Sequence, residues 1–167
     1  MFAAGLLAGG GFSGLLLWLA SGLVEPAPDV WRRLAVVAVA VLGVLRETGL
    51  TPVPLPQNRR QIPQDVLRRG VARGAAQFGF ELGTGVRTYV PASAPYVLAL
   101  AVLLVGQQLH VAVLAGLGFG VGRAAAPLAR YASGAGEAWD VRMSARLRVI
   151  SVGGAVVIAV CLALLLA

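Results

Sequence analysis

The sequence has no lysine, a single cysteine and a single histidine, and each scarcity excludes a class of activity. Without lysine, the chain cannot form a Schiff base with a carbonyl substrate. Cys161 alone provides neither an intrachain disulfide nor a CxxC redox pair, and we expect it to be a small packing residue. His110 alone cannot build a histidine-rich metal centre, and the seven acids are dispersed along the chain. We therefore predict no catalytic residue, no metal and no cofactor, and expect a protein that is not an enzyme.

Charged residues are also scarce, at 13% of the chain, whereas 58% of the residues are hydrophobic. An ordinary soluble domain is about 25% charged. The net charge of +7 comes from arginines that lie between apolar runs and not on one polar face, so it does not predict nucleic-acid binding. The composition predicts an all-α integral membrane protein whose first partner is the lipid bilayer.

Five apolar segments are candidates for crossing the bilayer, which takes about 20 mainly apolar residues per helix. They lie at residues 2–24, 30–50, 75–106, 109–122 and 149–167, in one predicted transmembrane domain over 1–167. The first segment has no charge and lacks the basic start of a signal peptide, so we expect a retained span. The second has a short apolar core, anchored by Trp31, Arg32 and Arg33 at one end and by Arg46 and Glu47 at the other.

The third segment is too long for one crossing and too short for two crossings with a turn. We predict one discontinuous helix: a first half to about Thr88, a break at Pro91–Pro95, and a second half from Ala94 that Ser93 caps. Broken helices survive in a bilayer only inside protein or beside an aqueous cavity, and many transporters bind solutes at such breaks. The alternative is a surface turn, or a proline kink that serves packing alone.

Two arginine-rich loops, at 51–73 and 123–148, set the predicted topology. The first includes a short amphipathic helix over 64–73 that we expect to lie in the membrane interface. The positive-inside rule places both loops in the cytoplasm, which requires an even number of crossings between them. The broken third span and the fourth span supply two. We therefore predict five crossings of the plasma (inner) membrane, with the N-terminus cytoplasmic and the C-terminus outside.

Glu81 and Arg87 are the only acid and base deep inside an apolar segment. Intramembrane charges are costly, so they pair, line water or mark a solute pathway. The alternative places Arg87 at the far interface and Glu81 against a neighbouring helix. Arg87 and the Ser93-capped half-helix favour an anionic group. His110 either adds a proton-sensitive group or is an ordinary interfacial residue. The predicted substrate-binding residues are Glu81, Thr84, Arg87, Pro91, Ser93, Pro95 and His110.

Small residues recur at the spacing that lets two membrane helices touch. The GxxxG pairs are Gly5/Gly9, Gly10/Gly14, Gly79/Gly83, Gly116/Gly120 and Gly118/Gly122. Glycines allow close helix contact where lipid provides no hydrophobic driving force. We expect tight helix packing, and a homo-oligomer or a complex with another membrane subunit.

The segment from Phe80 to Gly106 carries a distant family resemblance. It reads F-E-L-G at Phe80–Gly83, then P-A-S-A-P at Pro91–Pro95, followed by an apolar half-helix. This resembles the CcdA/DsbD-type membrane electron carriers of the lysine-exporter-like superfamily, in which F-x-x-G precedes a break of the form P-C-x-x-P. The family's reactive cysteine would fall at Ala92, and its second cysteine-bearing helix has no counterpart. The resemblance therefore implies a broken-helix scaffold without the thiol relay. Those families also pair two related halves, so it implies that a second copy or a partner chain supplies the other half.

The sequence thus favours a transporter-like inner-membrane protein that binds or moves a small solute at a broken helix. The alternative is a non-catalytic subunit that anchors or assembles a larger membrane complex, because a small chain with glycine-rich faces and two basic loops suits that role equally well.

Overall fold

The computed structural model describes residues 1–56, 70–86 and 88–166, and the regular secondary structure within these ranges is all helical. The helices are α1 (Phe2–Ser21), α2 (Asp29–Glu47), α4 (Val71–Gly83), α5 (Ala94–Val105), α6 (Leu109–Ser133) and α7 (Gly136–Leu166). The all-α class is therefore confirmed. The predicted interfacial helix over 64–73 lies mostly outside the described residues.

Three of these helices, α1, α6 and α7, are long and apolar enough to cross a membrane. The chain is therefore membrane-associated by the character of its helices. The two further crossings that the sequence predicts fall on α2, which has 19 residues with charges at both ends, and on the segment 75–106, which forms most of α4 (13 residues) and all of α5 (12 residues).

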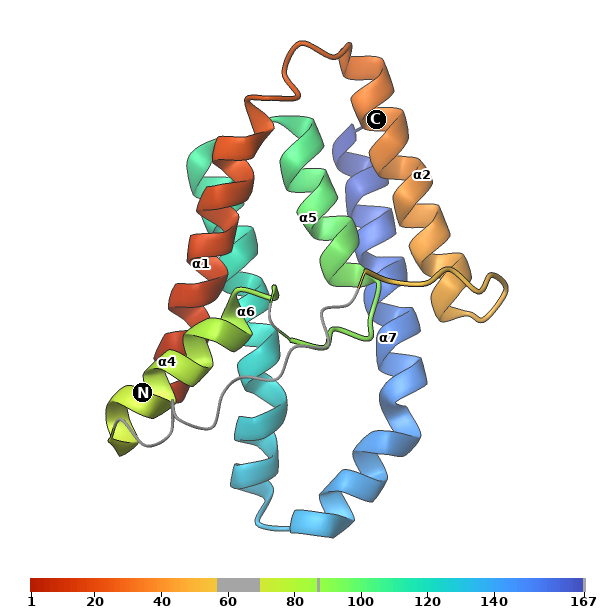
Figure 1. Cartoon of the computed structure of the whole chain (residues 1–167). Helices are drawn as coiled ribbons and strands as arrows, with labels where there is room; N and C mark the ends of the chain where they lie inside the picture. Colours follow the sequence, from red (N-terminus) through yellow and green to blue (C-terminus); the bar gives the residue numbers. More distant parts are fainter. Residues whose placement is uncertain (57–69, 87, 167) are drawn as a thin grey trace.

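One group of helices is built around α1, which packs against α4 on one side and α6 on the other (Figure 1). The contacts are between backbones. A Cβ atom added to Gly10 would lie 2.1 Å from the carbonyl oxygen of Gly116, and one added to Gly79 would lie 2.2 Å from that of Phe2. Only glycine fits at such distances, so the predicted close packing through small residues is confirmed for these helices.

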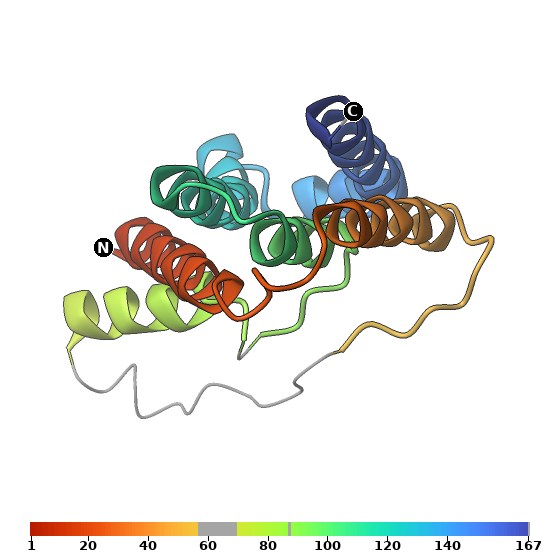
Figure 2. The same ribbon diagram turned by 90° about the horizontal axis from the view of Figure 1, so that it is seen from above.

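The second group consists of α2, α5 and α7. Within it, α5 lies on the side that faces α1 and α6 (Figure 2). Side chains connect the ends of these helices. Arg33 Nη1 donates to the carbonyl oxygen of Leu166 at 3.0 Å, and Arg148 Nη2 donates to that of Thr48 at 3.0 Å. Since the two contacts lie at opposite ends of α2, this helix runs antiparallel along the apolar second half of α7.

Two predicted boundaries differ from the structure. The helix expected to reach Thr88 ends at Gly83, because Gly85 takes the left-handed conformation (φ +70°) and turns the chain out of the helix. The expected loop over 123–148 is almost wholly helical, since α6 continues to Ser133 and α7 begins at Gly136. Alanine-rich sequence favours this extension, and Gly134 ends α6 in the left-handed conformation.

Candidate functional site

The predicted site residues divide between the α4–α5 connection and one outlying position. Glu81 lies on α4, and Thr84, Pro91, Ser93 and Pro95 lie in the connection or at the start of α5. His110 lies apart from them, exposed in the first turn of α6. The prediction for Arg87 falls outside the described residues. The structure therefore places five of the seven predicted residues on α4, in the α4–α5 connection or at the start of α5.

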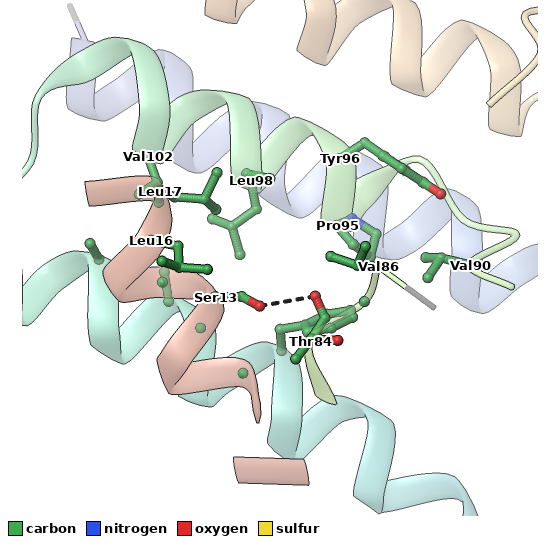
Figure 3. A pocket seen from close by; sticks show the side chains of 18 residues that line it. Ser13, Leu16, Leu17, Thr84, Val86, Val90, Pro95, Tyr96, Leu98 and Val102 are labelled. Carbon is green, nitrogen blue, oxygen red and sulfur yellow. Dashed lines mark hydrogen bonds between the residues drawn. The ribbon is translucent and has the colours of Figure 1, made fainter. Parts of the chain in front are cut away.

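A cavity of about 290 Å³ lies where α1, α5 and α6 meet the chain that follows α4 (Figure 3). Of the predicted residues, Thr84 and Pro95 line it. The rest of its wall is mainly apolar, with Leu17, Val86 and Leu98 pointing inward among the side chains labelled in Figure 3. A largely apolar wall with a few polar atoms is typical of small-molecule sites.

Ser13 is a cavity residue that sequence reasoning missed. Its hydroxyl donates a hydrogen bond of 2.9 Å to the carbonyl oxygen of Thr84, across the contact between α1 and the end of α4 (Figure 3). Because Gly85 turns the chain out of the helix at this point, the Thr84 carbonyl needs a partner outside its own helix. The available signal was a hydroxyl directly beside Gly14 in a glycine-rich apolar helix.

The start of α5 is held by Glu47 at the end of α2. The backbone N–H of Ser93 donates to Glu47 Oε1 at 2.8 Å. The Ser93 hydroxyl lies 2.8 Å from the same oxygen and 3.1 Å from the carbonyl oxygen of Gly43, and it can donate its one proton to either. Ser93 occupies the cap position that the sequence predicts, but its side chain makes no cap hydrogen bond to α5. The carboxylate of Glu47 does this work instead.

Arg46 completes this arrangement. Its Nη1 lies 2.7 Å from Glu47 Oε1 and 3.1 Å from the carbonyl oxygen of Pro91. A carboxylate of the protein itself therefore lies at the N-terminus of α5, where the sequence led us to expect an anionic group of the solute. The sequence held a signal for it: an acid at the C-terminal end of a helix, as Glu47 is on α2, opposes the helix dipole and so needs a partner elsewhere.

Glu81 is half-buried and does not line the cavity. Its Oε1 accepts a hydrogen bond of 3.2 Å from Gln77, and its carbonyl oxygen accepts one of 2.8 Å from the hydroxyl of Thr84. Glu81 thus contacts the cavity wall through Thr84. Its predicted relation to Arg87 stays a prediction.

Arg123 is the second residue that the sequence did not single out. Its Nη2 donates to the hydroxyl of the buried Thr88 at 2.7 Å, and its guanidinium lies 5.7 Å from the centre of the Phe119 ring. Phe119 in turn lines the cavity. The first charge after the apolar part of α6 therefore fixes the non-helical segment against the cavity wall.

Cys161 lies exposed on the surface of α7, so it does not pack in the interior as expected. In the described parts of the chain, no three His, Cys, Asp or Glu side chains come together in a group that could hold a metal ion.

No protein-family model matches the chain, and no solved structure matches it. A methylamine utilization protein, MauF of Methylophilus methylotrophus, is 32% identical to the chain over 129 residues. The matched region covers 73% of the chain and 42% of MauF. The match therefore spans less than half of the length of that curated relative.

Proposed function

We propose that the chain is a transporter-like inner-membrane protein that crosses the bilayer five times and binds a small solute in the cavity beside the α4–α5 connection. The observation that carries the proposal is the position of this cavity. It opens between three helices at the place where the helical backbone is interrupted. Interrupted backbone within a membrane protein is typical of solute sites, because its polar groups need protein or a polar cavity beside them.

The contacts of α7 support five crossings. Its most apolar part lies between Arg148 and Leu166, and these residues bind opposite ends of α2. The 18 residue steps from Arg148 to Leu166 rise by about 27 Å, close to the hydrocarbon thickness of about 30 Å. If this part of α7 is in the bilayer, α2 lies in it too. The same holds for α5, which is bound to α2 at Ser93 and packs along it.

In this arrangement α4 and α5 together form the third crossing, with the break toward the cytoplasmic side. Three arginines support a position of the break near the cytoplasmic surface. Arg46 binds the carbonyl oxygen of Pro91, and Arg123 binds the hydroxyl of Thr88. Arg148 lies at the same end of α2 as Arg46. Arginines outnumber acids at this end of the bundle, which is the distribution expected of the cytoplasmic side. The N-terminus would then be cytoplasmic and the C-terminal end of α7 outside.

The cavity wall favours a small, largely apolar solute over an anion, because Glu47 already occupies the N-terminus of α5. The similarity to a methylamine utilization protein suggests a short alkylamine, bound in its uncharged form beside the hydroxyls of Ser13 and Thr84. An alkylamine has a pKa near that of lysine, about 10.4. Below that pKa, the apparent affinity is expected to rise about tenfold for each unit by which the pH increases, because the uncharged fraction of the amine increases tenfold.

Filling the cavity tests the proposal. Ala115→Leu places a larger side chain in the wall, whereas Ala125→Leu changes an exposed position of the same helix. Methylamine binding to the protein in nanodiscs, measured by calorimetry against empty nanodiscs, should fall by at least about tenfold in Ala115→Leu and stay unchanged in Ala125→Leu. Equal binding by both variants, or an affinity that does not change between pH 7 and pH 9, would contradict an uncharged amine in this cavity.

Glu81→Gln tests the solute path separately from binding in the cavity. The substitution keeps the acceptor of the Gln77 hydrogen bond, so expression and folding should be preserved. We expect solute exchange by liposomes containing this variant to fall to the level of protein-free liposomes. The reason is that a charged side chain inside a membrane is costly, and such charges typically serve a solute pathway. Unchanged exchange would show that Glu81 is only a structural residue.

A second candidate function, a membrane subunit that organises a larger complex, is supported by one unused glycine face. Cβ atoms added to Gly118 and Gly122 on α6 would meet nothing within 4 Å, whereas those added to the pairs Gly5/Gly9, Gly10/Gly14, Gly79/Gly83 and Gly116/Gly120 would each meet a neighbouring backbone. A helix of another copy or another protein would fit this face. A partner that co-purifies in mild detergent and is lost on Gly122→Leu would favour this function, and an isolated monomer would exclude it.

The kinship with CcdA/DsbD-type carriers stays a proposal. The helix end at Gly83 and the interrupted backbone before Pro95 support a scaffold of that kind. Ala92 stands where the reactive cysteine would be, and the only cysteine lies on α7, so a thiol relay has no place in this chain.

A further inference from the structure

A second cavity, of about 350 Å³, lies at the opposite end of the helices from the arginine-bound break. It forms where α1 ends, α2 begins and α5 ends, which is the upper end of the molecule in Figure 1. Trp18, Ser21, Glu25, Arg32 and Gln107 contribute its aromatic, polar and charged side chains. It has no wall residue in common with the cavity beside the α4–α5 connection.

Arg32 gives this cavity a deeply placed positive charge. Its side chain is only 13% exposed, although it lies in the first turns of α2. Asp29 binds its Nη2, but the Asp29 side chain is 69% exposed and so shared with solvent. The Nε atom is buried and has no hydrogen-bond acceptor among the described residues. A guanidinium with an unused donor is suited to an oxyanion, which it can bind through two parallel hydrogen bonds after a small reorientation.

Two other residues that line the cavity, Glu25 and Trp18, suit a cation. Glu25 lines it and makes no hydrogen bond or ion pair with any described residue. The last turn of α5 also ends at this cavity, at Gly106 in the left-handed conformation, but this end belongs to the Arg32 side, since a Cβ atom added to Gly106 would lie 3.6 Å from Arg32 Nη1. Trp18 adds an aromatic ring, a further favourable neighbour for an ammonium group.

We propose that this cavity binds a zwitterionic group that carries an ammonium at one end and a phosphate or carboxylate at the other. Arg32 holds the oxyanion, and Glu25 with Trp18 holds the ammonium. A simple anion would be repelled by Glu25, and a simple cation by Arg32, whereas a zwitterion satisfies both. A volume of about 350 Å³ is within the usual range for a small-molecule site.

Two sources supply this chemistry, namely a soluble zwitterion and the headgroup of phosphatidylethanolamine. Phosphoethanolamine is the soluble probe, and its binding to the delipidated protein in detergent is measured by calorimetry. We expect saturable binding that weakens by at least about tenfold in Glu25→Gln and in Arg32→Gln, because each loses one charge-assisted contact. Ethanolamine alone and inorganic phosphate alone should bind at least about tenfold more weakly than phosphoethanolamine.

Matched controls separate the cavity from general charge effects. Arg33→Gln removes the neighbouring arginine, which faces Leu166 and not the cavity, and Glu137→Gln removes an exposed acid at the far end of α7. Both variants should bind phosphoethanolamine as the unmodified protein does. The folding of each variant is checked by circular dichroism, and the double variant Glu25→Gln/Arg32→Gln, which keeps the local charge balanced, serves if either single variant unfolds.

Native mass spectrometry from nanodiscs identifies the source. Retention of phosphatidylethanolamine in preference to phosphatidylcholine, lost in Arg32→Gln, supports the site and assigns it to a lipid headgroup. Binding of phosphoethanolamine without lipid retention supports the site and assigns it to a soluble ligand. Absence of both, or equal binding by the cavity variants and their controls, overturns the proposal.

Discussion

The two groups of helices are held together in different ways. Around α1, backbone lies against backbone over the whole length of the contact, and glycines from Gly5 to Gly14 make this approach feasible. Around α2, apolar side chains such as Val36 and Val97 are buried between the helices, and hydrogen bonds of Glu47, Arg148 and Arg33 connect the helix ends. Glycine contacts cannot shift without a clash, whereas hydrogen bonds at helix ends can be exchanged for water or for a ligand.

The cavity beside the α4–α5 connection lies between these two groups, with α1 and α6 on one side and α5 on the other. This position suggests that the first group is a rigid frame and that α5 is the wall that can move. Substitutions can test this contrast at three places, namely the glycine contacts, the contacts at the helix ends, and the single hydrogen bond across the cavity.

Gly10→Leu should have the largest effect. Its Cβ would lie 2.1 Å from the carbonyl oxygen of Gly116, so α1 and α6 must separate. We expect a loss of unfolding free energy of at least about 3 kcal/mol, measured by thermal or steric-trap unfolding in detergent. Gly153→Leu on α7 is the matched control, because nothing lies within 4 Å of its Cβ position. Similar losses in both variants would refute the role of backbone contact.

Glu47→Ala should have an intermediate effect. The Glu47 side chain is 9% exposed and accepts hydrogen bonds from Ser93 and Arg46. Its removal leaves the N-terminus of α5 without an acceptor and costs about 2–3 kcal/mol of unfolding free energy. Glu137→Ala, at an exposed acid of α7, should cost less than about 0.5 kcal/mol. Hydrogen exchange provides a second readout.

The exchange measurement distinguishes the two helix groups. In Glu47→Ala, amide protection should fall in α5 and stay unchanged in α1 and α6, because the glycine contacts do not depend on Glu47. A uniform loss of protection over all helices would show that the two groups unfold as one unit, and the contrast between a frame and a movable wall would then be wrong.

The sequence predicted the parts of this fold that depend on local signals. Apolar length predicted α1, Pro95 predicted the start of α5 at Ala94, and glycine spacing predicted the packing around α1. Contacts between distant residues were not predictable. Glu47 and Ser93 are 46 positions apart and Arg123 and Thr88 are 35 apart, and no periodicity in a single sequence connects them.

The residues of the candidate site also divide into those with a local sequence signal and those whose role depends on a distant partner. Pro95 was found because prolines interrupt helices, and Thr84 was found because it shares a helix face with Glu81. Ser13 was missed, because its role depends on a partner 71 positions away. The end of the first half-helix was placed too late for a related reason. The left-handed turn at Gly85 competes with a sequence that otherwise favours helix, and one glycine among many gave no sign of its conformation.

Ser13→Ala should have the smallest effect on stability and a visible effect at the cavity. It removes one hydrogen bond, to the carbonyl oxygen of Thr84, at a cost of about 1 kcal/mol. Ser144→Ala removes a comparable bond within α7, where the exposed carbonyl of Val141 is rehydrated, and should cost less. Because the Thr84 carbonyl belongs to the cavity wall, Ser13→Ala should also increase amide exchange at residues 84–86. Unchanged exchange there would mean that Thr88, held by Arg123, already fixes this segment, and that α1 contributes to the cavity through its glycines alone.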